Sequence, residues 1–388
     1  MITNKDIMEL EIEKSNGNGS TNYLTHNFHA YPAKFIPQIP RSTIMKFTKE
    51  GEVVLDPFCG CGTTLVEAKL HNRNAIGVDL NPIAVLISKA KTTPLNKYQI
   101  EKALEILPKI KEDISRYYSN KKILVNYKIP MFYNINHWFQ DNVIHELAIV
   151  REYISNLDDE CLKNYLNTAF SALIVSVSNQ ESDTRFAAKN KNIKPFKVIL
   201  ELARRLDDMN KRMTDFYQKA SSASVKVYQA DSQKLTFLKD NSIDHIVTSP
   251  PYANTYDYYL YHKFRIQWLG YNLKEVQDNE IGSRDKHSSK RKEISTFSEC
   301  ISNCLKEMSR ILKPNKLAVI IIGDSVIRGK LICAGKLIEE IAPLNNFEVI
   351  REISYNLKLN SKMFNPKFTN GDKLEHIMVL RNVKEQKC

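Results

Sequence analysis

The stretch Gly51–Ala68 reads GEVVLDPFCGCGTTLVEA and is the strongest motif in this chain. Its first part, Val53–Asp56, is an apolar run that ends in an acid, which predicts a buried strand. Gly60 and Gly62 then predict a turn in which a ligand can approach the backbone closely. The stretch therefore predicts a strand, a turn and a helix in immediate succession.

A second strand is predicted at Asn74–Asp79, after a helix that begins near Thr63 or Thr64. In open α/β sheets, an acid at the end of the second strand of such a β–α–β unit binds ribose hydroxyls. Asp79 is therefore a candidate ribose ligand, and Asp56, beside the turn, suits a ligand with a positively charged amino end. The glycine spacing does not match the dinucleotide fingerprint and no Walker lysine follows, which argues against a phosphate cradle.

The stretch Ile243–Tyr252 reads IDHIVTSPPY and is the second informative motif. It predicts a short buried strand that stops abruptly, because prolines lack the N–H group that a central strand needs. The first proline also holds Ser249 in an extended conformation. The resulting stiff turn presents a hydroxyl, unpaired carbonyls and a flat ring, which together suit a planar group with an exocyclic amine. A proline loop with a packing tyrosine is the alternative.

The composition favours a nucleic-acid partner. The chain has a formal net charge of +12 and a pI of about 9.1. This charge is typical of proteins that bind polyanions, and a merely basic protein is the alternative. The seven cysteines are odd in number and scattered, so neither a disulfide framework nor a zinc site is expected. No signal pattern or long apolar run occurs, so we expect a cytoplasmic protein without membrane association.

The periodicity divides the chain into three parts. Residues 1–96 hold an N-terminal lid segment and the first strands, residues 97–222 a mainly helical insertion, and residues 223–388 the remaining strands with the Ser-Pro-Pro-Tyr turn. In the insertion, helical spacing covers residues 100–119, 145–156, 161–178 and 195–219. In the last part, a strand at 225–230 precedes Asp231, and a terminal strand pair is expected near 347–355 and 376–382.

Several segments are candidates for contact with a nucleic acid. The insertion, with its basic run at 189–197, is the first candidate for target recognition, and the basic loops 282–292 and 358–373 are the second. The stretch 253–269 interleaves tyrosines with cations, which is typical either of base stacking or of a helix packed on the core.

The segment His26–Pro37 gathers two histidines, three aromatic residues, a lysine and two prolines. Such a composition is unusual for a linker. It indicates either a lid or wall of a ligand pocket, or a loop that packs its aromatic rings on the core.

These motifs resemble those of the amino-methylating DNA methyltransferases that use S-adenosylmethionine. The stretch Asp56–Thr64 is similar to their cofactor-binding motif, and Thr248–Tyr252 resembles their catalytic motif in the form typical of cytosine-N4 enzymes. The segment His26–Phe35 resembles their third cofactor segment. The resemblance implies an α/β fold, a Rossmann-like class I methyltransferase sheet with helices on both faces, here carrying a mainly helical insertion.

By this resemblance, S-adenosylmethionine is the expected cofactor. Asp56 and the backbone near Gly60 would hold its methionine part, Asp79 its ribose and Asp231 its adenine amine. The full set expected at the cofactor site is Phe28, Tyr31, Lys34, Asp56, Pro57, Phe58, Gly60, Gly62, Thr63, Thr64, Asp79, Leu80, Asp231 and Ser232.

The expected catalytic set is Ser249, Pro250, Pro251 and Tyr252. The resemblance implies that the Ser249 hydroxyl and the Pro250 carbonyl bind the target amine while Tyr252 stacks on the base. The implied reaction is site-specific methylation of cytosine N4 in duplex DNA after base flipping, as part of a restriction–modification system. Double-stranded DNA is the expected partner, with a cognate restriction endonuclease as a further candidate.

Three alternatives remain at this stage. In the first, the chain methylates adenine N6 in DNA through the same hydrogen bonds to the target amine. In the second, it methylates guanine N2 in RNA, although such RNA enzymes usually carry asparagine in place of Ser249. A nucleic-acid-binding protein that performs no transfer is the third. The acids at 56, 79 and 231 beside an intact Ser-Pro-Pro-Tyr turn argue against this last alternative.

Overall fold

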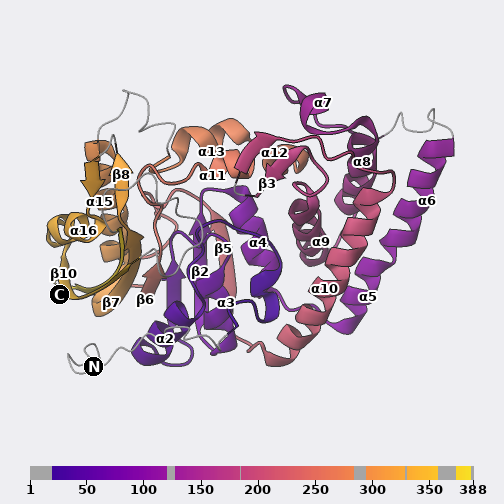
Figure 1. The fold of residues 1–388 in the computed structure, drawn as a ribbon. Coiled ribbons are helices and arrows are strands. Elements are labelled where there is room, and N and C mark those ends of the chain that lie inside the picture. Colours follow the sequence, from indigo (N-terminus) through magenta and orange to yellow (C-terminus); the bar gives the residue numbers. More distant parts are fainter. Residues whose placement is uncertain are drawn as a thin grey trace.

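The computed structural model describes residues 20–119, 127–183, 185–283, 294–327, 330–356 and 373–385. Its centre is a seven-stranded sheet with the strand order β10-β11-β7-β6-β1-β2-β5. Figure 1 shows helices packed around this sheet and a helical layer beyond its β5 edge. Most of the polar start at 1–22 and of the basic loops at 282–292 and 358–373 lies outside the described residues.

Five neighbouring strands of the sheet are parallel, namely β5 (Val225–Gln229), β2 (Asn74–Asp79), β1 (Val53–Asp56), β6 (Ile243–Thr248) and β7 (Leu312–Gly323). β11 (Leu374–Asn382) pairs antiparallel with β7, and β10 (Phe347–Asn356) pairs antiparallel with β11. The predicted α/β class and the terminal strand pair are therefore confirmed. Because parallel strands end at the same edge of a sheet, the acidic and Ser-Pro-Pro-Tyr motifs all reach one edge.

Helices cover both faces of the sheet, and the alternation of side chains along β7 explains how. Leu317, Val319 and Ile321 pack on one face with side chains of α2 (Gln38–Phe47) and α3 (Thr63–Leu70). Ala318, Ile320 and Ile322 pack on the other face with α15 (Ile294–Ile311) and α16 (Ala334–Ile341). Successive strand residues point to opposite faces, so a continuous apolar run is what a strand buried on both faces needs.

The helix after β1 begins at Thr63, as predicted, and the helix after β2 is α4 (Pro82–Thr92). The Asn81 side chain accepts a hydrogen bond from the N–H of Ile83 at 3.0 Å, and Pro82 occupies the first turn. Both features are typical of a helix start, since the first N–H groups of a helix lack partners within it.

The insertion contains α5 (Lys97–Leu104), α6 (Ile106–Ser119), α7 (Ile135–Trp138), α8 (Asp141–Ser155), α9 (Glu160–Leu173) and α10 (Lys197–Lys219). The helix predicted at 100–119 is in fact two helices. Pro108 lies just inside α6 and has no N–H for the carbonyl of Leu104, which breaks the helix there. The helix predicted at 161–178 ends at Leu173, and a hairpin of β3 (Gln180–Ser182) and β4 (Arg185–Ala188) follows. No helix in the described part of the chain is long and apolar enough to cross a membrane.

The insertion is not a separate body. Along α10 the buried side chains recur every three or four residues, at Val198, Leu202, Leu206, Met209, Met213 and Phe216. They belong to one core that also contains Phe28 of the N-terminal segment and Phe264 and Trp268, which follow the Ser-Pro-Pro-Tyr turn. Three segments that are distant in the sequence therefore share this core.

Candidate active site

A cavity opens at the carboxyl ends of the parallel strands. It encloses about 850 Å³ of space, including the part that is open to solvent. The predicted site residues that line it are Tyr31, Lys34, Phe58, Gly60, Thr63, Asp79, Leu80, Asp231, Ser232, Ser249 and Pro251. The candidate cofactor residues and the serine of the Ser-Pro-Pro-Tyr turn thus lie around one cavity, at the edge where open α/β sheets bind ligands.

Asp79 holds the glycine turn to the end of β2. Its carboxylate accepts hydrogen bonds from the backbone N–H groups of Gly60 at 2.9 Å and Asn81 at 2.8 Å. Gly60 has a φ of +47°, and a Cβ at this position would lie 3.3 Å from the ring of Tyr31. Burial raises the pKa of Asp79 to about 6. Donors from a ligand would stabilise the ionised form of this carboxyl group.

Gly62 is required for packing between helices. Its φ is +77°, and a Cβ here would lie 2.8 Å from the Ser88 hydroxyl of α4. That hydroxyl donates to the carbonyl of Gly60 at 2.9 Å, so α4 supports the turn from behind. Gly62 is not among the residues that line the cavity. Close approach of a ligand to the backbone is therefore expected at Gly60 and not at Gly62.

Asp56 lies buried at the end of β1, behind the cavity. Its Oδ1 accepts hydrogen bonds from the Thr248 hydroxyl at 2.7 Å and the Phe58 N–H at 3.1 Å. Its Oδ2 is buried and has no hydrogen-bond partner among the described residues. Burial raises the pKa of Asp56 to about 6. Because an unsatisfied buried carboxylate oxygen is costly, this atom suits a bound donor or cation.

Pro57 and Thr64 support the site from outside the cavity. The Pro57 carbonyl accepts a hydrogen bond from the Ser232 hydroxyl, which connects the ends of β1 and β5. The Thr64 hydroxyl donates to the Val247 carbonyl at 3.4 Å, which connects α3 to β6. Both residues hold the strand ends in register.

The Ser-Pro-Pro-Tyr turn leaves the sheet directly after β6. Ser249 and Pro251 line the cavity, whereas the ring of Tyr252 packs on Gly323 at the end of β7. A Cβ at Gly323 would lie 2.5 Å from that ring. The Tyr252 hydroxyl donates to Glu375 at 2.7 Å, and burial together with Glu375 raises the pKa of Tyr252 well above its usual value. The phenol is therefore neutral and fixed against the sheet.

Comparison with known proteins assigns the family. Residues 5–90 and 243–387 match the family model described as DNA methylase, which is more than half of the chain. The chain belongs to the DNA methylase family. The helical insertion at 97–222 lies entirely outside the matched residues.

Three relatives are informative. Type II methyltransferase M.MvaI from Kocuria varians is 31% identical over 288 residues, with 69% of this chain and 62% of that protein covered. Type II methyltransferase M.MjaII from Methanocaldococcus jannaschii is 25% identical, with 77% of this chain and 72% of that protein covered. A tRNA (guanine(10)-N2)-dimethyltransferase from the same archaeon is 40% identical, but over only 15% of this chain. The methylase thus spans somewhat less than two thirds of the length of M.MvaI.

One wall of the cavity in this methylase was not predicted. It is formed by α11 (Tyr258–Tyr261) and α13 (Leu273–Asn279) together with the residues after α13, and contributes Tyr258, Val276, Asn279, Glu280 and Ile281. The Glu280 carboxylate accepts hydrogen bonds from the N–H groups of Tyr258 at 2.7 Å and Tyr259 at 2.9 Å, which fixes this wall. The tyrosine-rich composition of 253–269 was the signal, but its spacing did not distinguish a cavity wall from a core helix.

The N-terminal segment forms an adjoining wall of the cavity, since the Tyr31 ring stacks on Tyr258 with ring centroids 6.0 Å apart. The Tyr31 ring stacks on His262, with ring centroids 5.0 Å apart. The segment is anchored by Glu67 of α3, which accepts a hydrogen bond from the Tyr23 hydroxyl at 2.5 Å and bonds with His26 at 2.7 Å. Phe28 does not line the cavity. It packs edge-to-face on Tyr165 in the helical core, so its role in the structure is to anchor this segment.

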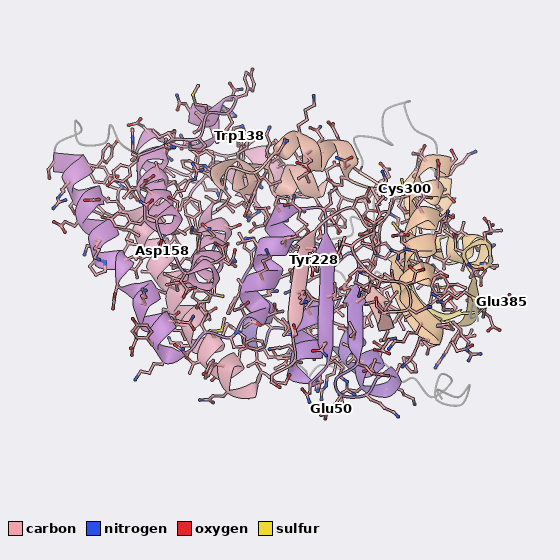
Figure 2. The ribbon with its side chains drawn as sticks, turned by 180° about the vertical axis from the view of Figure 1, so that it is seen from behind. Glu50, Trp138, Asp158, Tyr228, Cys300 and Glu385 are labelled. Atoms are coloured by element: carbon pink, nitrogen blue, oxygen red, sulfur yellow. The ribbon has the colours of Figure 1, made fainter. Side chains whose placement is uncertain are left out.

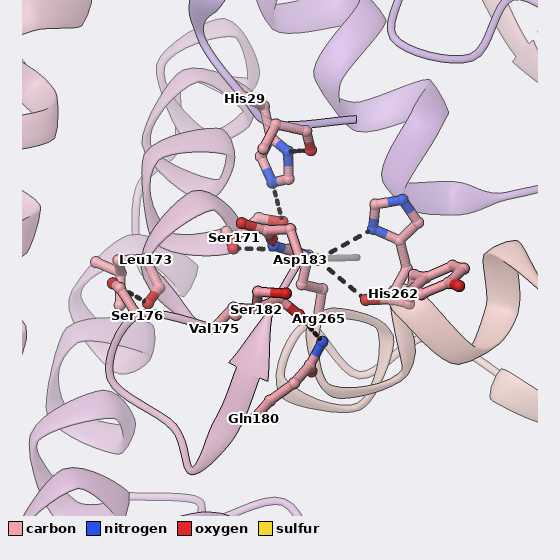
Figure 3. Close-up of polar contacts among 12 residues, drawn as sticks. His29, Ser171, Leu173, Val175, Ser176, Gln180, Ser182, Asp183, His262 and Arg265 are labelled. Atoms are coloured by element: carbon pink, nitrogen blue, oxygen red, sulfur yellow. Dashed lines mark hydrogen bonds and ion pairs between the residues drawn. The ribbon is translucent and has the colours of Figure 1, made fainter. Parts of the chain in front are cut away.

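Arg265 connects the parts of the methylase that surround the cavity. Figure 3 shows its side chain between α9, the residues before β4 and the segment around His262. Its Nε donates to the Ser171 carbonyl at 3.1 Å, and its guanidinium forms an ion pair with Asp183. The Ser171 hydroxyl also bonds with His29 at 3.0 Å. The N-terminal wall, the insertion and the segment after the Ser-Pro-Pro-Tyr turn therefore meet at one buried cation.

Proposed function

We propose that this methylase transfers a methyl group from S-adenosylmethionine to the exocyclic N4 amine of cytosine in duplex DNA, at a specific sequence and as part of a restriction–modification system. The observation that carries the proposal is that Ser249 lines the same cavity as Asp79, Asp231 and the glycine turn. The turn assigned to bind the target amine and the acids assigned to bind the nucleoside part of the cofactor therefore line the same cavity. The Type II methyltransferases similar to this chain support the same activity.

The residues at the cavity fit S-adenosylmethionine. Asp56 lies behind the residues that line the cavity, and its buried Oδ2, which lacks a hydrogen-bond partner among the described residues, is assigned to the amino end of the methionine part. Asp79 is assigned to the ribose hydroxyls and Asp231 to the adenine amine, and both line the cavity. Gly60 and Tyr31 both line the cavity, and the backbone near Gly60 is assigned to the methionine part. When bound, this cofactor supplies an electrophilic methyl group on a positively charged sulfur.

Ser249 and Pro250 prepare the nucleophile. The lone pair of cytosine N4 is delocalised into the ring, which makes this nitrogen a poor nucleophile. Hydrogen bonds from N4–H to the Ser249 hydroxyl and the Pro250 carbonyl favour a pyramidal nitrogen with its lone pair available for direct in-line displacement. Catalysis then consists of positioning and electrostatic stabilisation, and no covalent bond between the protein and the base is needed. The sequence has no Pro-Cys pair, which carbon-5 cytosine methyltransferases use as nucleophile motif.

The target base must leave the double helix to reach Ser249, because the cavity lies at the end of the sheet and N4 is paired inside a duplex. Flipping the base costs about a few kcal/mol. Tyr252 is assigned to stack on the flipped base. Because the ring packs on Gly323 and its hydroxyl donates to Glu375, a flipped base would contact the ring on the side that faces away from Gly323.

Adenine-N6 methylation uses the same grip and is the nearest alternative. Guanine-N2 methylation of RNA has less support, because the tRNA methyltransferase similar to this chain matches only 15% of it. A nucleic-acid-binding protein that transfers no methyl group has less support, because its binding function would not require Ser249 to line the same cavity as the candidate cofactor residues. The helical insertion is assigned to target recognition, and a cognate endonuclease is the expected partner in the cell.

Mass spectrometry of nucleosides tests the proposal directly. Genomic DNA from cells that express the chain should contain N4-methylcytosine that is absent from cells without it. N6-methyladenine instead would change the target base and leave the cofactor assignment intact. If neither mark forms in DNA while the purified protein binds S-adenosylmethionine, the proposed DNA substrate is wrong.

A further inference from the structure

Residues 127–134 present large apolar side chains to solvent. Met131 is 98% exposed and Tyr133 is 86% exposed, and Ile129 beside them is 38% exposed. Large apolar side chains that stay in water on one short segment often mark a contact surface. Phe132, between the two most exposed residues, points the other way and packs on the helical core. The alternation gives the segment one anchored side and one free apolar side.

The anchored side belongs to a cluster of aromatic rings. Phe132 packs against Phe264 with ring centroids 6.1 Å apart, and Trp138 of α7 packs against Phe264 at 4.9 Å and Phe186 of β4 at 4.7 Å. The N–H of Asn179 also donates to the Trp138 carbonyl at 2.7 Å. Phe264 follows His262, whose ring stacks on Tyr31 at the cavity. The exposed segment is therefore held rigidly by the same helices that support the cavity wall.

The short helix α7, which directly follows the exposed segment, lies at the same edge of the molecule as the helices that follow the Ser-Pro-Pro-Tyr turn. In Figure 1, α7 lies at the same upper edge as α11, α12 (Lys263–Trp268) and α13, which follow the end of β6. Figure 2 gives the same arrangement from behind, with Trp138 at the upper edge and Glu50, which precedes β1, at the lower edge. A duplex bound over the cavity would pass along this edge.

The surroundings of the segment are cationic. Residues 185–200 contain five Lys or Arg side chains, of which Arg185 pairs with Glu181 and Lys197 pairs with Glu201. The exposed positive charge of this strip therefore comes from its two exposed lysines. Lys189 and Lys194 are exposed, and this strip joins the segment through the contact of Trp138 with Phe186. A positive strip beside exposed apolar side chains suits a phosphate backbone with stacked bases next to it. It does not suit an uncharged apolar partner.

We propose that Met131 and Tyr133 insert into the DNA duplex beside the target base and take the place of stacking that is lost when the base flips. Apolar side chains that enter between base pairs unstack and bend a duplex, and aromatic side chains stack on bases. The proposal rests on the proposed DNA methyl transfer, and it adds the element that opens the duplex. Neither residue touches the cofactor cavity, so their contribution is to base flipping.

Methyl transfer by the variant M131A/Y133A tests the proposal on two duplexes. Both carry the recognition sequence identified from modified genomic DNA, and the second has an abasic site opposite the target base. On the normal duplex, the variant should transfer methyl groups at least about tenfold more slowly than the wild-type protein. On the abasic duplex, where flipping is easier, its rate should return to within about twofold of the wild-type rate. The affinity for S-adenosylmethionine should not change.

The variant Y98A/L344A is the matched control, because Tyr98 is 69% exposed and Leu344 is 79% exposed on other parts of the molecule. It should retain wild-type rates on both duplexes. Equal rates for the wild-type protein and M131A/Y133A on the normal duplex would overturn the proposal, and so would equal losses on both duplexes. If the wild-type protein itself transfers no methyl group to DNA, the proposed function fails instead.

Discussion

At the scale of single residues, the site depends on carboxyl groups that burial has kept away from water. Asp56 and Asp79 both have a pKa of about 6, raised by burial. The folded protein therefore binds their protons more tightly than the unfolded chain does. The two carboxyl groups therefore contribute to the free energy of unfolding at low pH, and this contribution is lost as the pH rises through about 6. A ligand that is cationic or donates hydrogen bonds can offset the loss.

The affinity for S-adenosylmethionine should fall as the pH is lowered through this pKa. At pH 5.5, about a quarter of a carboxyl group with a pKa of 6 is ionised, so the loss from Asp79 alone is about fourfold relative to pH 7.5. Isothermal titration calorimetry at a series of pH values measures this. In D79N the affinity should be lower at pH 7.5 and should vary less with pH. An unchanged pH dependence in D79N would exclude Asp79 as the titrating ligand.

Ser249 should matter for transfer and not for cofactor binding. In S249A the target amine loses one hydrogen-bond acceptor, so the rate of methyl transfer should fall by about tenfold or more. The dissociation constant of S-adenosylmethionine should stay within about twofold of the wild-type value. Single-turnover methyl transfer and calorimetry measure the two quantities. Wild-type turnover in S249A would contradict the proposed grip on the amine.

The two glycines 62 and 51 separate the effect of packing from that of backbone conformation. Both residues have a φ near +78°. A Cβ at Gly62 would lie 2.8 Å from the Ser88 hydroxyl, whereas a Cβ at Gly51 would have no neighbouring atom within 4 Å among the described residues. G62A should lower the free energy of unfolding by about 2–4 kcal/mol, since it adds a clash to the strain. G51A should cost only about 1 kcal/mol. Urea unfolding measures both, and equal losses would show that packing on α4 does not matter.

At the scale of elements, the cavity depends on how α9, the β3–β4 hairpin and α12 are joined. Arg265 is almost fully buried, and Asp183 between β3 and β4 is its carboxylate partner. This ion pair could not be predicted from the sequence, because Arg265 and Asp183 lie far apart along the chain. His262, which directly precedes α12, stacks on the Tyr31 ring, so the position of Tyr31 depends on the position of α12.

Removing the Asp183 carboxylate should loosen this connection. D183N should lower the free energy of unfolding by about 1–2 kcal/mol, because the buried guanidinium loses its charged partner. It should also weaken cofactor binding, because the wall formed by Tyr31 is less well held. E181Q is the control, since Glu181 pairs with the exposed Arg185 and should contribute at most about 0.5 kcal/mol. Equal effects of D183N and E181Q would argue against the connection.

At the scale of the whole molecule, the helical insertion carries exposed lysines on the loop between β4 and α10. Lys191 is fixed by its hydrogen bond to the Val175 carbonyl at 2.8 Å, whereas Lys189 and Lys194 are exposed and suited to phosphate contacts. The insertion thereby adds a positively charged surface to the molecule. Its shared core with Phe28 and Trp268 keeps that surface in a fixed position relative to the sheet.

The variant K189A/K194A should weaken DNA binding and flatten its dependence on salt. Each phosphate contact contributes about 0.9 to the slope of log K against log salt concentration, so the slope should fall by about 2. The variant K97A/K219A removes the same charge elsewhere on the insertion and should keep the wild-type slope. Fluorescence anisotropy at several salt concentrations measures the slopes. An unchanged slope in K189A/K194A would rule out both lysines as phosphate contacts.

Local sequence patterns were sufficient to predict the sheet, the turn and most of the residues that line the cavity. The strand at Val53–Asp56, the turn at Gly60 and the stop after Thr248 are encoded by neighbouring residues, through continuous apolar runs, glycine conformation and proline chemistry. Since parallel strands end at one edge, the order of the motifs was enough to bring Asp79, Asp231 and Ser249 together.

The way in which the remaining parts surround that edge became visible only in the folded molecule. The place of Phe28 in the helical core, the wall formed by Tyr258 and Glu280, and the position of the Tyr252 ring on Gly323 all depend on contacts between distant segments. Such contacts leave no periodic signal in either partner. Burial of the carboxyl groups of Asp56 and Asp79, which sets their pKa, is likewise a property of the assembled fold and of no local sequence.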